Sequence, residues 1–328
     1  MRIILQIIIF LLNAYAGSAQ LIWQNVDSLY LPLPNSVHVY KTTDLLDDKP
    51  NIAYYVIADL KDKKLDFTAD TTYNRRFTPA QFYEKNEKPL LVVNCTFFSF
   101  ETNRSLNVVI KKGKLLAYNQ HSIAGKGKDT LTYKHTFGSA IGISRKRNPD
   151  VAWLFTDSSV KFPYALQGVV PPINDSKKVF HFYDAIRMIK KSYPENSRVR
   201  LFFPAWKMKT AIGGGPVLLQ NGEIKITNNE ELKFTGKAID DKHPRTAMGY
   251  TKDNKLIILV VEGRHPGIAE GATLTQEAQI FKDLGCWEAL NLDGGGSSCM
   301  LINGKETIKV SDAVGQRPVP AVFIIKEN

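Results

Sequence analysis

The chain alternates between short apolar runs and polar turns, and most of the runs have the length of β-strands. "PVLLQNGEIKI" and "CMLINGKETI" each place an Asn-Gly pair between two such runs, which is the strongest short-range signal of a β-hairpin. "LNVVIKKGKLLAY" and "AIGISRKRNPDVAWLF" also predict hairpins, and "TAMGYTKDNKLIILVV" predicts two strands joined by a polar turn. Hairpins therefore dominate the predicted structure.

Helices are few. The segments that begin at Thr78 and at Thr273 each carry a glutamine three residues later, as in a capping box. Between residues 179 and 191 the apolar side chains recur on one helical face, and Pro194 closes that segment. A few helices beside many hairpins predict an α+β fold with mixed, largely antiparallel sheets.

Residues 1–19 have the pattern of a secretory signal peptide. Arg2 precedes an apolar run from Ile3 to Leu12, and small residues follow at positions 17 to 19. The run is too short to span a membrane, and an ordinary N-terminal helix is the alternative. We expect cleavage near Ala19 and a periplasmic or extracellular protein with no membrane span.

Composition narrows the class of protein. With 44% hydrophobic residues the chain can build a large core. Its net charge of +11 comes largely from lysine-rich turns such as "KKGK", "GKGK" and "SRKR". No aromatics are interleaved there, so we interpret these turns as solvated loops and expect no nucleic-acid partner. A basic surface favours anionic glycans or phosphate-bearing substrates.

The number and spacing of cysteines and histidines argue against a disulfide scaffold and against a zinc site. Cys95, Cys286 and Cys299 are too few for a disulfide scaffold, although one pair could form in an oxidising compartment. The chain has no CxxC or HxxxH spacing, which argues against a zinc site.

Several predicted strands end in glycine together with a charged or amide side chain. These ends are "VVNCTFF", "AIGGGPVL", "VVEGRHPG" and "NLDGGGSS", and "KHPRTAMG" places Arg245 before another strand. Each residue alone is typical of a turn or a cap. Together, Asn94, Glu262, Arg264 and Asp293 with Arg245 and the glycines indicate one cleft that binds an anion and performs acid–base chemistry.

The order of these motifs resembles the phosphodiester glycosidase family over roughly residues 88 to 326. Asn94 matches the asparagine of the family's Asn-Gly-x-Phe-Phe motif, although Cys95 stands where glycine is usual. The other matching positions are Gly213 to Pro216, Arg245, Glu262, Arg264, and Asp293 with Gly294 to Gly296. The resemblance implies a catalytic domain at residues 88–328, on which residues 20–87 pack or which they extend.

The resemblance also implies an exported glycoside hydrolase that cleaves a sugar-1-phosphodiester, of the N-acetylglucosamine-1-phosphate type, into free sugar and a phosphomonoester. Phosphate is a weak base with a second pKa near about 6, so it needs little help from a general acid, unlike the leaving group of an ordinary glycoside. Such a site needs positive charge on the phosphate and a negative or basic group at the anomeric carbon.

The candidate residues can be assigned to these two tasks. Asp293 or Glu262 suits the anomeric carbon, as nucleophile or as base. Arg245 and Arg264 suit the phosphate, and the amides of residues 294–296 could add an anion nest. The full predicted substrate-binding set is Arg245, Arg264, Asn94, Gly214, Gly215, Gly294, Gly295, Gly296 and Ser297. No cofactor is required, although the two carboxylates could hold calcium.

Two alternative functions are a non-catalytic binding module and a serine hydrolase. A non-catalytic glycan- or phosphoglycan-binding module of the cell surface would use the same cleft without turnover. A serine hydrolase using Ser297 or Ser298 is disfavoured because no G-x-S-x-G elbow is present.

Overall fold

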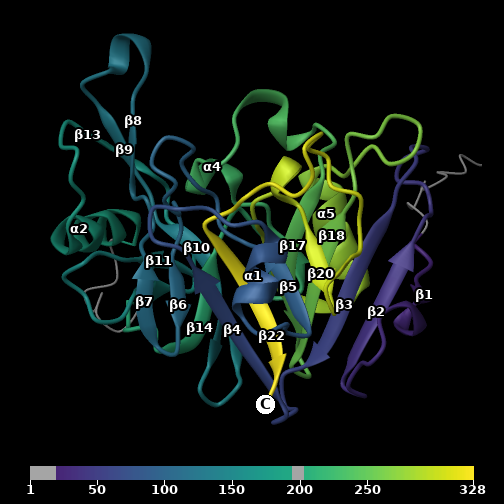
Figure 1. Ribbon diagram of the computed structural model, residues 1–328. Coiled ribbons are helices and arrows are strands. Elements are labelled where there is room, and N and C mark those ends of the chain that lie inside the picture. Colours follow the sequence, from purple (N-terminus) through teal and green to yellow (C-terminus); the bar gives the residue numbers. More distant parts are fainter. Residues whose placement is uncertain (1–19, 194–202) are drawn as a thin grey trace, which may run out of the picture.

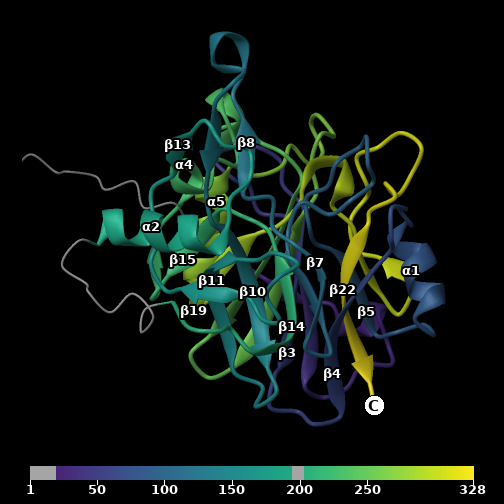
Figure 2. The same cartoon turned by 90° about the vertical axis from the view of Figure 1, so that its left-hand side faces the viewer.

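The described part of the chain, residues 20–193 and 203–328 of a computed structural model, folds into four sheets with a few helices (Figures 1 and 2). The predicted signal peptide and Pro194 lie outside these residues. Every strand pairing within them is antiparallel. The predicted α+β fold with largely antiparallel sheets is confirmed.

The widest sheet has eight strands. In spatial order they are β1 (Gln24–Asn25), β2 (Val37–Thr42), β3 (Ala53–Asp59), β18 (Lys255–Val261), β17 (Arg245–Thr251), β19 (Cys286–Asn291), β15 (Val217–Gln220) and β16 (Glu223–Ile224). β3 pairs with β18 from Ala53 opposite Val261 to Asp59 opposite Lys255. Strands from before residue 88 are thus hydrogen-bonded to strands that follow it.

Three smaller sheets complete the fold. The five-stranded sheet has the order β21 (Lys305–Glu306), β20 (Met300–Ile302), β5 (Leu91–Asn94), β22 (Ala321–Glu327) and β4 (Leu65–Thr71). The six-stranded sheet has the order β12 (Tyr164–Leu166), β11 (Pro149–Phe155), β10 (Gly138–Ser144), β14 (Met208–Gly213), β6 (Val109–Lys111) and β7 (Lys114–Ala117). β13 (Ile173–Asp175), β9 (Tyr133–His135) and β8 (Ser122–Ala124) form the last sheet, whose β8–β9 hairpin projects from the body (Figure 1).

The predicted hairpins and caps are present. The Asn-Gly turns join β15 to β16 and β20 to β21, and the other predicted hairpins are β6–β7, β10–β11 and β17–β18. Thr78 and Thr273 cap the helices α1 (Pro79–Lys85) and α5 (Leu274–Asp283), each in a complete capping box. α2 (Phe182–Ser192) begins after the N-cap residue His181, a little later than the apolar pattern alone predicts.

The remaining helical segments are short. They are α4 (Asn228–Glu231) and the 3-10 turns η1 (Asp27–Leu29), η2 (Gly127–Asp129), η3 (Gly236–Ile239) and η4 (Gly295–Ser297). η4 lies in the glycine-rich motif that follows β19, so the NLDGGGSS segment leaves its strand as a tight turn.

One apolar core joins the three larger sheets. It contains Val56 and Ile258 from the eight-stranded sheet, Phe323 from the five-stranded sheet, and Trp153 and Ile212 from the six-stranded sheet. Because side chains alternate along a strand, the opposite faces need their own cover. α5 packs on the outer face of the eight-stranded sheet and α1 on that of the five-stranded sheet (Figure 2).

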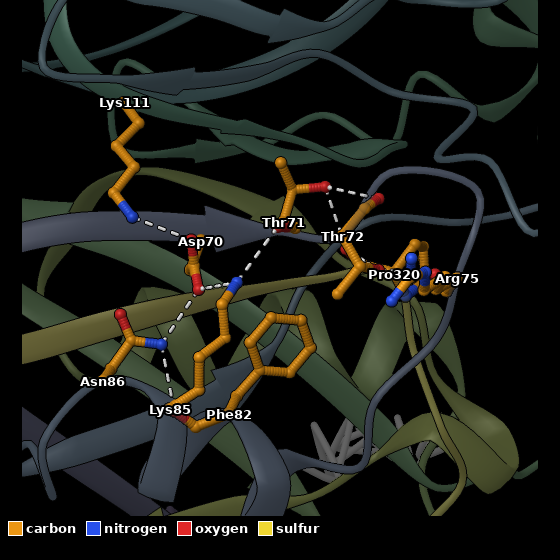
Figure 3. Close-up of polar contacts among 9 residues, drawn as sticks. All are labelled: Asp70, Thr71, Thr72, Arg75, Phe82, Lys85, Asn86, Lys111 and Pro320. Carbon is orange, nitrogen blue, oxygen red and sulfur yellow. Dashed lines mark hydrogen bonds and ion pairs between the residues drawn. The ribbon is translucent and has the colours of Figure 1, made fainter.

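A buried carboxylate ties the five-stranded sheet to its neighbours (Figure 3). Asp70 on β4 accepts hydrogen bonds from Asn86 Nδ2 at 2.9 Å and from Lys111 Nζ at 2.7 Å, and forms an ion pair with Lys85 at 2.7 Å. Burial opposes its ionisation, but the bonds from Lys111, Lys85 and Asn86 outweigh burial and lower its pKa. Asp70 therefore links β4 with β6 and with the end of α1.

Candidate active site

Four strand ends meet at one edge of the molecule. Val261, which ends β18, pairs with Arg245, which begins β17, and Ala247 of β17 pairs with Asn291 of β19. The segments after Val261 and Asn291 therefore leave the sheet side by side. The end of β5 joins them through Asn94. The strand ends that the sequence predicts to converge do lie together.

Hydrogen bonds of the Asn94 side chain hold the loop that carries Asp293. Asn94 is fully buried, and its Nδ2 donates to the Asp293 carbonyl at 2.5 Å. Its Oδ1 accepts from Thr246 Oγ1 at 2.9 Å and from the Cys299 amide at 3.1 Å. Its side-chain amide is thus already bonded within the protein, so the geometry gives Asn94 a positioning role rather than the predicted contact with substrate.

The Asp293 carboxyl is strongly perturbed by its surroundings. Its Oδ2 and the nearby Ser297 Oγ are buried without a hydrogen-bond partner. Burial raises the pKa of Asp293 to about 7, and the nearby Ser297 hydroxyl and the Arg317 charge act in the opposite direction without cancelling it. A carboxyl with this pKa exchanges its proton near neutral pH, as a general base requires, and is ionised in a large fraction of molecules, as a nucleophile requires.

The glycines after Asp293 are required by close approach. A Cβ on Gly294 would lie 2.8 Å from the Pro244 carbonyl, and Gly295 has a left-handed φ of 61°. A side chain on Gly296 would collide with the Arg317–Asp312 ion pair. The Gly295 amide donates to the Pro244 carbonyl at 2.8 Å, so this amide cannot contribute to the predicted anion nest.

The two predicted arginines differ. Arg245 is buried, and it donates from Nε to the Ala272 carbonyl at 2.8 Å and from Nη2 to the Asp241 carbonyl at 3.1 Å. Arg264 is exposed, has a left-handed φ of 62°, and its guanidinium lies beside Gly295. Arg264 pairs with no carboxylate among the described residues. Arg264 is therefore the one available to an anion, and Arg245 holds the surrounding loops.

Glu262 is held in a different environment from Asp293. Its Oε1 lies 2.9 Å from His265 Nδ1, and its Oε2 accepts from the Lys309 amide at 2.9 Å. Both oxygens of this buried carboxylate are engaged, whereas Asp293 keeps one free. Of the two predicted catalytic carboxylates, Asp293 is the better placed to react.

Gly214 and Gly215 lie behind the same loop. Gly215 precedes Pro216 in a cis peptide bond, and its amide donates to the Asn291 carbonyl at 2.7 Å. Asn291 Nδ2 returns a bond of 2.7 Å to the Gly215 carbonyl. Beside this turn lies a cavity of about 190 Å³. A larger cavity of about 610 Å³, lined by Asp59 and Lys255, lies at the opposite end of the eight-stranded sheet.

Sequence reasoning misses three charged residues of this region. Arg317 forms a bidentate ion pair with Asp312, and its charge lowers the pKa of Asp293. The sequence offers one signal for it, because "QRPVPAVF" places Arg317 shortly before a strand, as "HPRTAMG" places Arg245. Lys233 lines the smaller cavity, in a stretch without any motif. Glu277 on α5 is fully buried near Arg245, and burial raises its pKa to about 8.

Neither a disulfide nor a clear metal cluster is part of the site. Cys95, Cys286 and Cys299 are buried free thiols, so the pair that could form is not formed, and burial raises the pKa of each thiol. Within residues 20–193 and 203–328, no group of three or more His, Cys, Asp or Glu side chains is arranged to hold a metal ion. Calcium binding stays a prediction.

Comparison with known proteins decides the family. The model of the phosphodiester glycosidase family matches residues 87–326, which is most of the chain. The chain belongs to the phosphodiester glycosidase family. Its fold resembles the catalytic domain of zebrafish N-acetylglucosamine-1-phosphodiester alpha-N-acetylglucosaminidase, auto-inhibited by its pro-peptide, with a TM-score of 0.58 and 20% identity over 95% of this chain and 90% of that one. A hypothetical protein from Synechocystis matches with a TM-score of 0.59 and 13% identity, over 94% of this chain and 64% of that one.

The curated relatives match a shorter stretch of this family member. The mouse N-acetylglucosamine-1-phosphodiester alpha-N-acetylglucosaminidase is 30% identical over 95 residues, which are 26% of this chain and 18% of the relative. An uncharacterized prophage-derived protein of Bacillus subtilis is 37% identical over 83 residues, 25% of this chain and 13% of the relative. The aligned stretch is thus under a fifth of either relative. No helix among the described residues is long and apolar enough to cross a membrane.

Proposed function

We propose that this family member is an exported glycoside hydrolase that cleaves a sugar-1-phosphodiester of the N-acetylglucosamine-1-phosphate type. Water adds to the anomeric carbon, the bond from that carbon to the phosphate oxygen breaks, and free sugar and a phosphomonoester leave. The observation that carries the proposal is the buried, unpartnered Oδ2 of Asp293 in the same loop as the glycines that Arg264 approaches.

The roles follow from what each side chain has free. Asp293 acts at the anomeric carbon, as nucleophile or as the base that activates water. Arg264 binds the phosphate, because its guanidinium is exposed and pairs with no described carboxylate. Asn94 and Arg245 hold the loops, since their polar groups are bonded to protein. The expelled phosphate is a weak base, so no strong general acid is needed.

A glycan- or phosphoglycan-binding module is the second candidate. The observation that favours it is the full engagement of Glu262, whose oxygens are bonded to His265 and to the Lys309 amide. That engagement leaves Asp293 as the freer of the two predicted carboxylates, whereas most glycosidases use a pair. In this reading the cleft binds a sugar phosphate and releases it unchanged.

The test uses residues 20–328 and the methyl diester of N-acetylglucosamine 1-phosphate, with free sugar and phosphomonoester followed by NMR. Release of both products, lost in Asp293→Asn with an unchanged melting profile, is the expected result. The anomer released first reports retention or inversion. Saturable shifts of the sugar signals without product would replace the hydrolase by the binding module.

A further inference from the structure

The cavity of about 190 Å³ beside the Gly-Gly-Pro turn is lined by both apolar and polar side chains. Its lining includes Phe97, Asn107, Asn119, Thr136, Glu231 and Lys233. Two hydrogen bonds connect this lining with the loop that carries Asp293. The lining residue Asn107 donates to the Gly214 carbonyl, and the next residue, Gly215, donates from its amide to the carbonyl of Asn291, two residues before Asp293. The cavity therefore lies near the Asp293 loop.

Most polar groups of the cavity wall are satisfied by the protein. Asn107 accepts from the Phe97 amide at 3.1 Å and donates to the Gly214 carbonyl at 3.1 Å. Asn119 accepts from the Val108 amide at 2.8 Å and donates to the Gly138 carbonyl at 3.1 Å. These amides shape the cavity and are not free to select a ligand.

Glu231 is satisfied as well. Its two oxygens accept four hydrogen bonds, from Ser139 Oγ, Trp153 Nε1, the Val217 amide and Thr227 Oγ1, at 2.5 to 3.1 Å. Four donors stabilise a buried carboxylate without a cation. Glu231 therefore does not need the ammonium of the neighbouring lysine.

Lys233 is the charged group that the cavity leaves without a partner. Its Nζ lies 5.6 Å from the centre of the Phe97 ring and forms no ion pair with any described carboxylate. A Cβ on Gly215 would collide with Lys233 Cε, so the glycine of the turn leaves room for this side chain. Burial lowers the pKa of the ammonium, and the charge of Glu231 partly opposes that effect. Lys233 is half-buried. An ammonium that loses part of its hydration without gaining an anionic partner is destabilised, and an anionic ligand would offset that loss.

We propose that this cavity is an anion subsite in which the Lys233 ammonium binds a negatively charged group of the substrate. The group is a phosphate or a carboxylate, either the phosphate of the diester or an acid carried by the sugar. This inference rests on the proposed function, because it assigns a substrate contact to the cavity beside Asp293. It adds to that function a recognition element outside the family's motifs.

The experiment measures binding of two probes, inorganic phosphate and glucuronate, by calorimetry to residues 20–328. At least one probe is expected to bind, and Lys233→Met should weaken that probe about 10- to 100-fold, the usual effect of losing a hydrogen bond to a charged group. Lys237→Met is the matched control, because Lys237 is an exposed lysine of the same segment. Lys233→Arg keeps the charge and should retain part of the affinity.

Each outcome has a distinct meaning. Phosphate binding that depends on Lys233 assigns the subsite to the diester phosphate, and glucuronate binding assigns it to an acidic sugar. Equal affinities in the wild type and in a folded Lys233→Met variant, or no binding of either probe to the wild type, would overturn the subsite. Lys233-dependent binding without any hydrolysis of the diester would overturn the proposed function and leave the subsite intact.

Discussion

At the scale of single residues, the site is defined by which polar atoms the protein leaves unbonded. Asn94, Arg245 and Glu262 match the family motifs, yet each is bonded to neighbouring groups. Asp293 Oδ2 and the exposed guanidinium of Arg264 are not bonded in this way. The motif residues therefore divide into those that build the loops and those that are available to a substrate.

The pKa of Asp293, about 7, predicts the pH dependence of hydrolysis. If Asp293 acts as nucleophile or base, only its ionised form is active, so kcat/KM should rise with pH and level off above about 7. The measurement is kcat/KM for the diester from about pH 5 to about pH 9. A rate that instead declines through that range would make Asp293 a general acid.

Glu277 gives a prediction about stability. Burial raises its pKa from 4.5 to about 8, and both its oxygens lack a hydrogen-bond partner. The unfolded chain loses this proton near pH 4.5 and the folded chain only near 8, so the charge destabilises the fold increasingly as pH rises between these values. Glu277→Gln should therefore raise the melting temperature more at high pH than at low pH.

Thermal unfolding of both proteins at about pH 5 and about pH 9 measures this difference, which can reach a few kcal/mol at the higher pH. The nearby Arg245 makes the result informative in either direction. A glutamine variant that is less stable at high pH would mean that Glu277 is ionised in the fold and stabilises the Arg245 charge.

At the scale of elements, the sequence predicts turns and helix caps correctly, but it does not predict the order of the strands in the sheets. The Asn-Gly turns and the capping boxes at Thr78 and Thr273 depend on a few neighbouring residues, and each forms as predicted. In the eight-stranded sheet β3 pairs with β18, although roughly two hundred residues of sequence separate the two strands. No periodicity encodes that pairing, because every buried strand offers a similar apolar face.

For the candidate site too, the sequence predicts the local feature and not the long-range contacts. Glycine and a polar group at each strand end predict a shared edge, because a turn there exposes side chains to a common cleft. Which guanidinium is free could not be predicted, since it depends on carbonyls of distant loops such as Ala272 and Asp241. Lys233 could not be predicted at all, because its place follows from packing against Phe97 and Gly215.

The Asp70 contacts predict how β4, β6 and α1 depend on one another. Asp70→Asn removes the charge that Lys85 and Lys111 share, and should cost about 1–3 kcal/mol near neutral pH. Because the pKa of Asp70 is lowered on folding, its contribution is present above about 3.8 and disappears as pH falls further. Urea unfolding at neutral and at acidic pH measures both effects.

Asp66→Asn is the control for that experiment. Asp66 lies on the same strand and pairs with Lys209, and its side chain is more exposed than that of Asp70, 22% against 8%. Exposed pairs contribute about 0–1 kcal/mol. Equal losses for the two variants would show that Asp70 contributes no more than a surface pair.

At the scale of the whole molecule, net charge and site chemistry act on the same ligand. The chain carries a formal charge of +11, and the proposed substrate carries a negative phosphate. Opposite charges speed up the encounter of enzyme and substrate. Salt suppresses this effect, because the Debye length falls from about 30 Å at about 0.01 M salt to about 3 Å at about 1 M salt. We expect kcat/KM for the diester to fall by roughly 3- to 10-fold over that range of salt, with little change in kcat.

Arg264→Gln separates the local from the global contribution. The variant loses the guanidinium beside Gly295, so its KM should rise about 10-fold or more at every salt concentration. Its remaining salt dependence then reports the rest of the surface, because the net charge changes by only one unit. Parallel salt profiles for the two proteins would assign the steering to the lysine-rich loops. A flat profile in the variant would mean that Arg264 alone provides it and that the charge elsewhere on the molecule has no part in substrate capture.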